Sequence, residues 1–191
     1  MKGKFLLSAF ALLMPLSLAA QVAKPAAADD ANEFNRYEVF AGVDYISANQ
    51  VFGSSALIGG HVGADAKLKK WFGGTVDFAD YGIAATSYGR LKPTVTTFLA
   101  GPEFYIPSES ITGFLHVMFG GQHTGGVGDK PDVAFTYAIG GGFEYLVKKH
   151  WAVRISGDDV VAKSVVDPNN TGSSPHPYSN GRATAGVAYR F

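Results

Sequence analysis

Residues 180–191 alternate between apolar and polar side chains without interruption. Val187, Tyr189 and Phe191 share one face of this segment, and Arg182 and Arg190 share the other. A β-strand directs successive side chains to opposite faces. The segment is therefore predicted to be a strand that is apolar on one side and polar on the other.

The same period-2 pattern recurs in segments of about ten residues throughout the chain. They are residues 37–46, 57–68, 72–79, 94–105, 113–123, 133–146 and 151–160. The connections between them are alternately long and short, and none of the later segments is an apolar run long enough for a transmembrane helix. This pattern predicts an all-β fold, an eight-stranded antiparallel up-and-down transmembrane β-barrel, with long outer loops and tight periplasmic turns.

The two faces of the predicted strands differ in bulk as well as in polarity. The polar face holds small residues such as Gly42, Gly140 and Gly186, whereas the apolar face holds Phe135 and Phe143. Eight strands leave an interior only wide enough for side chains to fill. We therefore expect the polar, small-residue face to line the lumen and the bulky apolar face to contact lipid.

Charges enclosed in such a lumen must be paired. Across two short turns the expected register sets Glu144 opposite Arg154 and Glu103 opposite His116. Closure of the barrel brings Arg190 near Glu38. We predict that these six residues form a structural salt-bridged layer near the periplasmic end. A looser outer layer is expected from Asp44, His61, Asp77, Asp158 and Arg182.

Composition excludes several functional classes. The formal net charge is zero, so no large basic surface points to nucleic acid. The chain has no cysteine, which removes disulfides and thiolate chemistry. Residues 1–20 have the positive and apolar regions of a signal peptide, residues 21–35 are predicted to be a disordered lead-in, and residues 36–191 form the predicted barrel.

No catalytic or metal-binding pattern stands out. His116 and His123 are an odd number of residues apart and face opposite ways on a strand, so they do not have metal-ligand spacing. His176 and Ser179 lie three residues apart, whereas a His/Ser pair on one face of a strand needs a spacing of two. The sequence therefore predicts no enzyme activity, no cofactor and no metal site.

Four motifs resemble the OmpA-like and OmpX-like family of small outer membrane protein β-barrel domains. They are residues 99–104, 113–121, 140–145 and 185–191. The resemblance implies a location in the outer membrane of a Gram-negative envelope, with lipid and lipopolysaccharide as partners. It also implies that Val187, Tyr189 and Phe191 form the C-terminal signal read by the outer-membrane assembly machinery. No counterpart of the peptidoglycan-binding domain of OmpA is present, so we expect a stand-alone barrel without peptidoglycan anchoring.

A structural role in envelope integrity is the leading functional expectation, and we expect a monomer. Two alternatives stay open. The outer loops could make the protein an adhesin or other surface-binding protein, or the barrel could be a narrow porin-like channel.

Overall fold

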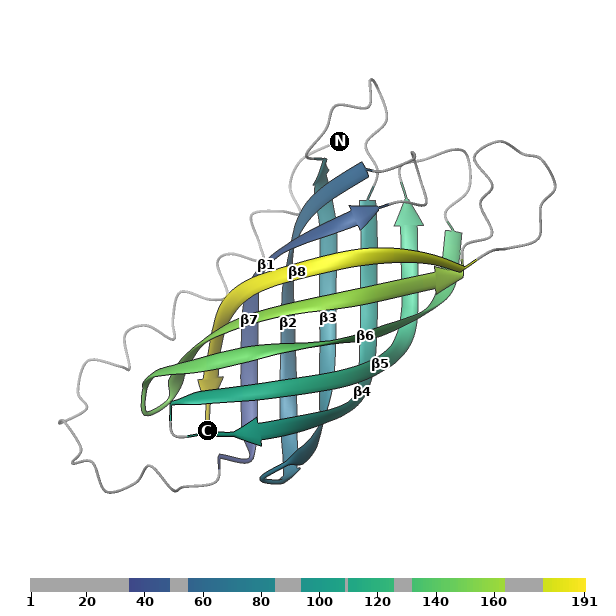
Figure 1. Cartoon of the computed structure of the whole chain (residues 1–191). Helices are drawn as coiled ribbons and strands as arrows, with labels where there is room; N and C mark the ends of the chain where they lie inside the picture. The colour runs from purple at the N-terminus through teal and green to yellow at the C-terminus, as the bar shows by residue number, and fades with distance from the viewer. Residues whose placement is uncertain (1–34, 49–54, 85–93, 109, 126–131, 164–176) are drawn as a thin grey trace. The chain divides into compact units, whose positions relative to one another are not determined.

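The computed structural model describes residues 35–48, 55–84, 94–108, 110–125, 132–163 and 177–191. The regular structure in these ranges consists of eight β-strands (Figure 1). No helix in the described part of the chain is long and apolar enough to cross a membrane. The strands are β1 (Tyr37–Ala48), β2 (Ser55–Lys69), β3 (Phe72–Ala84), β4 (Thr94–Pro107), β5 (Ile111–Gly125), β6 (Asp132–Lys148), β7 (Trp151–Lys163) and β8 (Pro177–Arg190).

The strands form one closed antiparallel barrel in sequence order. Each strand pairs with the next one along the chain, and β8 returns to pair with β1 (Figure 1). This closing seam runs from the pair Glu38–Arg190 to the pair Ile46–Arg182. Closure leaves no strand edge unpaired, which is the condition for a sheet to exist in hydrocarbon. The predicted fold class is confirmed.

The two ends of the barrel differ in their connections. Residues 70–71, 108–110 and 149–150 form short connections at one end, whereas residues 49–54, 85–93, 126–131 and 164–176 connect the strands at the other and lie outside the described residues. At the short-turn end, Phe191 N donates to Tyr37 O at 2.9 Å, so the last residue lies there too. The predicted signal peptide and almost all of the predicted lead-in also lie outside the described residues.

The sidedness of the strands matches the sequence pattern. On β6, Phe135, Ile139 and Phe143 are 62, 54 and 66% exposed, whereas Thr136 and Glu144 are fully buried. All eight strands repeat this arrangement, so bulky apolar side chains surround the barrel and most polar ones fill it. A water-soluble monomer rarely exposes so large an apolar surface. This surface is an apolar belt suited to contact with lipid chains.

The strands extend further at the long-connection end than the sequence pattern predicts. The strand expected at residues 72–79 continues to Ala84, and the strand expected from residue 180 begins at Pro177. The extensions carry inward side chains, including Tyr81, that pack in the lumen. The face expected to line the lumen does so, but at this end it also contains large apolar side chains that the sequence analysis did not predict there. We call this group the apolar plug: Ile46, Leu57, Ala79, Tyr81, Val95, Leu99, Met118, Ala138 and Val160.

Candidate functional site

The lumen near the short-turn end contains the six residues that the sequence singled out for charge pairing. Glu144 is the register partner of Arg154, Glu103 is the partner of His116, and Glu38 is the partner of Arg190. All six side chains point into the barrel, and Arg190 is the least buried of them. The three expected juxtapositions are therefore present in the sheet.

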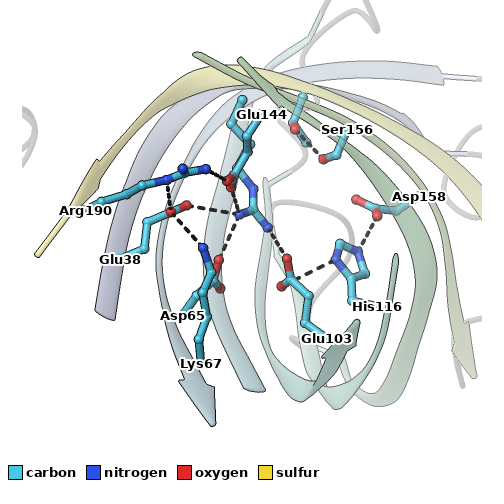
Figure 2. A network of polar contacts seen from close by, with 11 residues as sticks. Glu38, Asp65, Lys67, Glu103, His116, Glu144, Ser156, Asp158 and Arg190 are labelled. Atoms are coloured by element: carbon cyan, nitrogen blue, oxygen red, sulfur yellow. Dashed lines mark hydrogen bonds and ion pairs between the residues drawn. The ribbon is translucent and has the colours of Figure 1, made fainter. Parts of the chain in front are cut away.

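Arg154, on β7, is the centre of the charged network. Its Nη1 atom lies 2.5 Å from Glu144 Oε1, 2.8 Å from Asp65 Oδ2 and 3.5 Å from Glu38 Oε1. Its Nη2 atom donates to Glu103 Oε1 at 3.0 Å. Figure 2 shows the carboxylates of Glu38, Asp65, Glu103 and Glu144 converging on one point in the lumen. One guanidinium on β7 thus bridges four carboxylates, one from each of β1, β2, β4 and β6.

Two aromatic rings hold this guanidinium from its faces. The Cζ atom of Arg154 lies 4.3 Å from the ring centre of Phe40 and 3.9 Å from that of Phe114. Both rings are buried. Cation–π attraction is strongest where water is excluded, so the rings add to the ion pairs and restrict the orientation of the guanidinium plane.

Arg190 and Lys67 complete the network at the short-turn end. Arg190 Nε donates to Glu38 Oε2 at 2.8 Å, and Arg190 Nη2 donates to Glu144 Oε2 at 2.5 Å. Lys67 Nζ donates to the same Glu38 oxygen at 3.4 Å. We call the whole set the inner ionic cluster: Glu38, Asp65, Lys67, Glu103, Glu144, Arg154 and Arg190.

The pairing of Glu103 with His116 differs from the expectation in its side chains, although the register is as expected. His116 Nδ1 lies 4.0 Å from Glu103 Oε2, too far for a hydrogen bond. The other ring nitrogen, Nε2, lies 2.6 Å from Asp158 Oδ1. Glu103 already bonds to Arg154. His116 instead bonds to Asp158, and it thus lies between the inner ionic cluster and the Asp158 carboxylate (Figure 2).

The charges predicted for a looser outer layer form two separate groups. Arg182 Nε donates to Asp158 Oδ2, and Arg182 Nη1 donates to Asp77 Oδ1, both at 2.7 Å. His61 instead contacts Asp44. Asp44 also accepts a hydrogen bond from the Tyr81 hydroxyl at 3.2 Å, which connects this group to the apolar plug.

Sequence reasoning missed two members of the inner ionic cluster. Neither Asp65 nor Lys67 is among the predicted charge pairs. Lys67 contacts Glu38 diagonally on the adjacent strand β1, where the register partner of Glu38 is Asp65. Arg154 reaches Asp65 across the lumen, from β7 to β2. Strand register predicts contacts between adjacent strands only, so it could not predict this contact across the lumen.

The free space in the lumen is small. A cavity of about 10 Å³ lies between the charged groups, with Phe40, His61, Asp77, Met118 and Arg182 among the residues that line it. This volume has room for about one water molecule. Four buried polar atoms of described residues in the charged region lack a hydrogen-bond partner: Asp65 Oδ1, Glu103 Oε2, Tyr105 OH and His116 Nδ1. The site is therefore tightly filled but has polar atoms that a water could bind.

Three carboxylates of the inner ionic cluster lie close enough together to be considered as ligands of a metal ion. Glu38, Asp65 and Glu144 each offer an oxygen within 4.8 Å of the others. Arg154 contacts all three carboxylates, so a resident cationic side chain already meets their charge. The arrangement suits structural charge neutralisation better than it suits a metal ion.

The residues weighed for catalysis do not converge among the described ranges. Ser179 is exposed and donates to Asp159 Oδ1 at 2.5 Å, whereas the neighbouring Asn180 is buried on the lumen side. His116 is buried and His123 is exposed, as their odd spacing predicts. His176 lies outside the described residues.

The three residues predicted to form an assembly signal lie on the outward face at the end of the chain. Val187 and Phe191 are exposed, and Tyr189 is partly covered. The ring of Tyr189 lies 5.0 Å from those of both Trp151 and Phe191. Their role in assembly stays a prediction.

Comparison with known proteins gives a match in structure but not in sequence. No protein-family model matches the chain, and no curated protein sequence matches it significantly. The chain is similar to the crystal structure of Neisserial surface protein A, with a TM-score of 0.64 and 14% identity over 81% of this chain and 97% of that one. It is also similar to Ail, the attachment invasion locus protein of Yersinia pestis, with a TM-score of 0.50 and 16% identity over 81% of this chain and 97% of that one.

The fold and the exposed belt together indicate where the protein resides. Closed antiparallel barrels with an apolar outer band and a polar interior are transmembrane barrels of outer membranes. The described barrel has both properties. The chain therefore has the fold of the small eight-stranded outer-membrane β-barrels, and its surface is built for that membrane.

Proposed function

We propose that the protein is a structural barrel of the outer membrane, which contributes to envelope integrity as a closed, rigid element and has no catalytic activity. The observation that carries this proposal is that the lumen is filled at two levels and between them. The inner ionic cluster fills the short-turn end, the apolar plug fills the opposite end, and Arg182 with Asp77 and Asp158 lies between the two.

The two levels oppose conduction for different physical reasons. An ion that enters the inner ionic cluster has to displace a guanidinium that bridges four carboxylates. An ion that enters the apolar plug has to give up hydration among mostly apolar side chains, which costs free energy wherever no polar group replaces the water. The arrangement therefore favours a sealed barrel over the alternative of a narrow porin-like channel.

Planar-bilayer recording of the purified, folded protein tests this point. The expected result is a silent bilayer at voltages at which a true porin gives discrete, stable conductance steps. A matched control is Arg154→Lys, which keeps a cation in the inner ionic cluster and should be equally silent. Discrete conductance of the unaltered protein would overturn the sealed-barrel proposal.

Surface binding is the second candidate. Ail, one of the proteins with a similar fold, is an attachment invasion locus protein and has been crystallised with the heparin analogue sucrose octasulfate. In this chain the connection between β7 and β8, residues 164–176, is the longest between consecutive strands. Replacing it with a short Gly/Ser turn should leave the barrel folded, and loss of cell-surface binding in that variant would favour the adhesin.

A further inference from the structure

In the described part of the chain, the exposed charges outside the lumen differ between the two ends of the barrel. Among the side chains that the structure describes, the exposed cations lie at the short-turn end: Arg36, Lys69, Lys70, Lys148 and Lys149. The exposed carboxylates, those of Asp80 and Asp159, lie toward the long-connection end of their strands. This comparison does not include the charged residues outside the described ranges, among them Arg90, Lys92 and Glu109.

The cations are concentrated at two turns of similar design. The β2–β3 turn has Lys69 and Lys70 followed by Trp71, and the β6–β7 turn has Lys148 and Lys149 followed, after one residue, by Trp151. Both turns begin with an irregularity in strand register, between Lys67 and Lys69 in one case and between Leu146 and Lys148 in the other. Four strands separate the two turns in the barrel order, so they lie on opposite sides of the barrel.

Each lysine pair is followed by an aromatic cluster on the outer face. Trp71 stacks on Phe104 with ring centres 6.4 Å apart, and Lys69 Nζ lies 5.5 Å from the ring centre of Trp71. At the second turn, Trp151 lies 5.0 Å from Tyr189. Trp71 and Trp151 are 53 and 46% exposed. Amphipathic rings of this kind occupy the headgroup level of a membrane.

The backbone adds a further cation to the first turn. Lys67 N donates to Arg36 O at 2.7 Å, which brings the residue before β1 to the end of β2. The exposed Arg36 side chain therefore belongs to the same rim of the barrel as Lys69 and Lys70. The first turn thus combines three exposed cations with an aromatic platform.

We propose that the Lys69–Lys70–Trp71 and Lys148–Lys149–Trp151 turns are two binding sites for the headgroups of anionic glycerophospholipids in the periplasmic leaflet. The proposal rests on the proposed function, because it requires the short-turn end to lie at that leaflet. The lysines attract the lipid phosphate, and the tryptophans fix the turn at headgroup depth. Each lysine near an anionic membrane surface strengthens the attraction to that surface about fivefold, and added salt weakens this attraction.

The sequence makes the test direct, because Trp71 and Trp151 are the two tryptophans of the chain and each marks one site. The protein is refolded into vesicles of phosphatidylcholine and phosphatidylglycerol, with bromine on the acyl chains of one lipid or the other. Tryptophan quenching then reports the local lipid composition. We expect quenching by brominated phosphatidylglycerol to exceed that by brominated phosphatidylcholine at least about threefold at equal mole fraction, and the excess to fall with added salt.

Variants separate the two sites and the two sources of phosphate. Lys69→Gln/Lys70→Gln should remove the excess quenching of Trp71, measured in a Trp151→Phe background, and Lys148→Gln/Lys149→Gln should do so for Trp151 in a Trp71→Phe background. Lys130→Gln, outside both turns, should leave the excess unchanged.

Inorganic phosphate at millimolar concentration should not reduce the excess more than chloride of equal ionic strength, and a larger reduction would mean that the turns bind free phosphate instead of lipid.

The outcomes also distinguish this proposal from the one on which it rests. Equal quenching by the two brominated lipids would overturn the headgroup sites and leave the membrane barrel intact. Absence of quenching by either lipid would contradict membrane insertion itself. An excess that survives both lysine double variants would overturn the role assigned to the lysines.

Discussion

Glu38 and Arg190 lie 152 residues apart in the chain and are joined across the closing seam, with Arg190 Nε 2.8 Å from Glu38 Oε2. Glu38 also contacts Arg154 and Lys67, and Arg190 also contacts Glu144. The contact that closes the sheet is therefore part of the network that fills its lumen. Closure and filling of this barrel depend on the same side chains.

Removal of the central guanidinium should be strongly destabilising. In Arg154→Met the carboxylates of Glu38, Asp65, Glu103 and Glu144 lose a shared counter-charge in a buried site. Breaking a buried ion pair on one side costs about 3–5 kcal/mol. Urea titration of the protein in lipid vesicles measures the free energy of unfolding. Arg154→Lys keeps the charge but not the forked geometry and should lose less; equal losses for Met and Lys would argue against charge as the cause.

The contact between His116 and Asp158, which also binds Arg182, predicts energetic coupling between the two side chains. His116 Nε2 lies 2.6 Å from Asp158 Oδ1, and both side chains are buried. A double-mutant cycle with His116→Gln and Asp158→Asn should give an interaction free energy of about 0.5–3 kcal/mol. Additive single effects would mean that the contact contributes nothing to stability.

A glycine pair at the seam should be intolerant of side chains. Gly42 and Gly186 are register partners, and a Cβ atom on either would run into the backbone of the opposite strand, at Ala185 O or Ala41 O. Gly42→Ala should therefore destabilise the barrel by about 1–3 kcal/mol. Gly157→Ala is the matched control, because its added Cβ would be 3.8 Å from the nearest atom, Arg182 O. Equal stability of the two variants would show that the seam can separate to admit a methyl group.

The outward-facing residues at the end of the chain predict a variant that assembles less efficiently in cells but keeps its folding stability. Phe191 is exposed, with its ring packed at 5.0 Å from that of Tyr189, so Phe191→Ala removes little buried contact. If Val187, Tyr189 and Phe191 are read during assembly, this variant should accumulate less in outer membranes of cells but refold normally from urea into vesicles. Normal accumulation in cells would exclude a signalling role for Phe191.

The sequence contained enough information for the fold, because both the strand period and the sidedness are properties of neighbouring residues. The alternation of Phe135 and Ile139 with Thr136 and Glu144 predicted which side chains face outward. The short connections between strands also determined which residues face each other on neighbouring strands. Glu144 was therefore correctly predicted to lie opposite Arg154.

Contacts across the lumen could not be obtained in this way. Asp65 reaches Arg154 from β2 to β7, and His116 prefers Asp158 to its register partner Glu103. Such choices depend on side-chain length and competition for one guanidinium in three dimensions. Of the apolar plug, Tyr81 lies beyond the expected end of its strand, whereas the other members lie within the expected strands on the face assigned to the lumen. They were missed because the expectation for that face was based on its polar and small residues.

Sidedness is the central claim, and site-directed spin labelling tests it most directly. The chain lacks cysteine, so single cysteines can be placed along β6 from Ala134 to Tyr145 and labelled in the refolded protein, with each variant checked for altered gel mobility before and after boiling. Collision with oxygen, which concentrates in hydrocarbon, should be high at the outward positions Phe135, Ile139 and Phe143 and low at the inward positions Ala134, Thr136, Ala138 and Glu144. Uniform oxygen accessibility along β6, or high accessibility at Thr136 and Glu144 instead, would contradict the barrel described above.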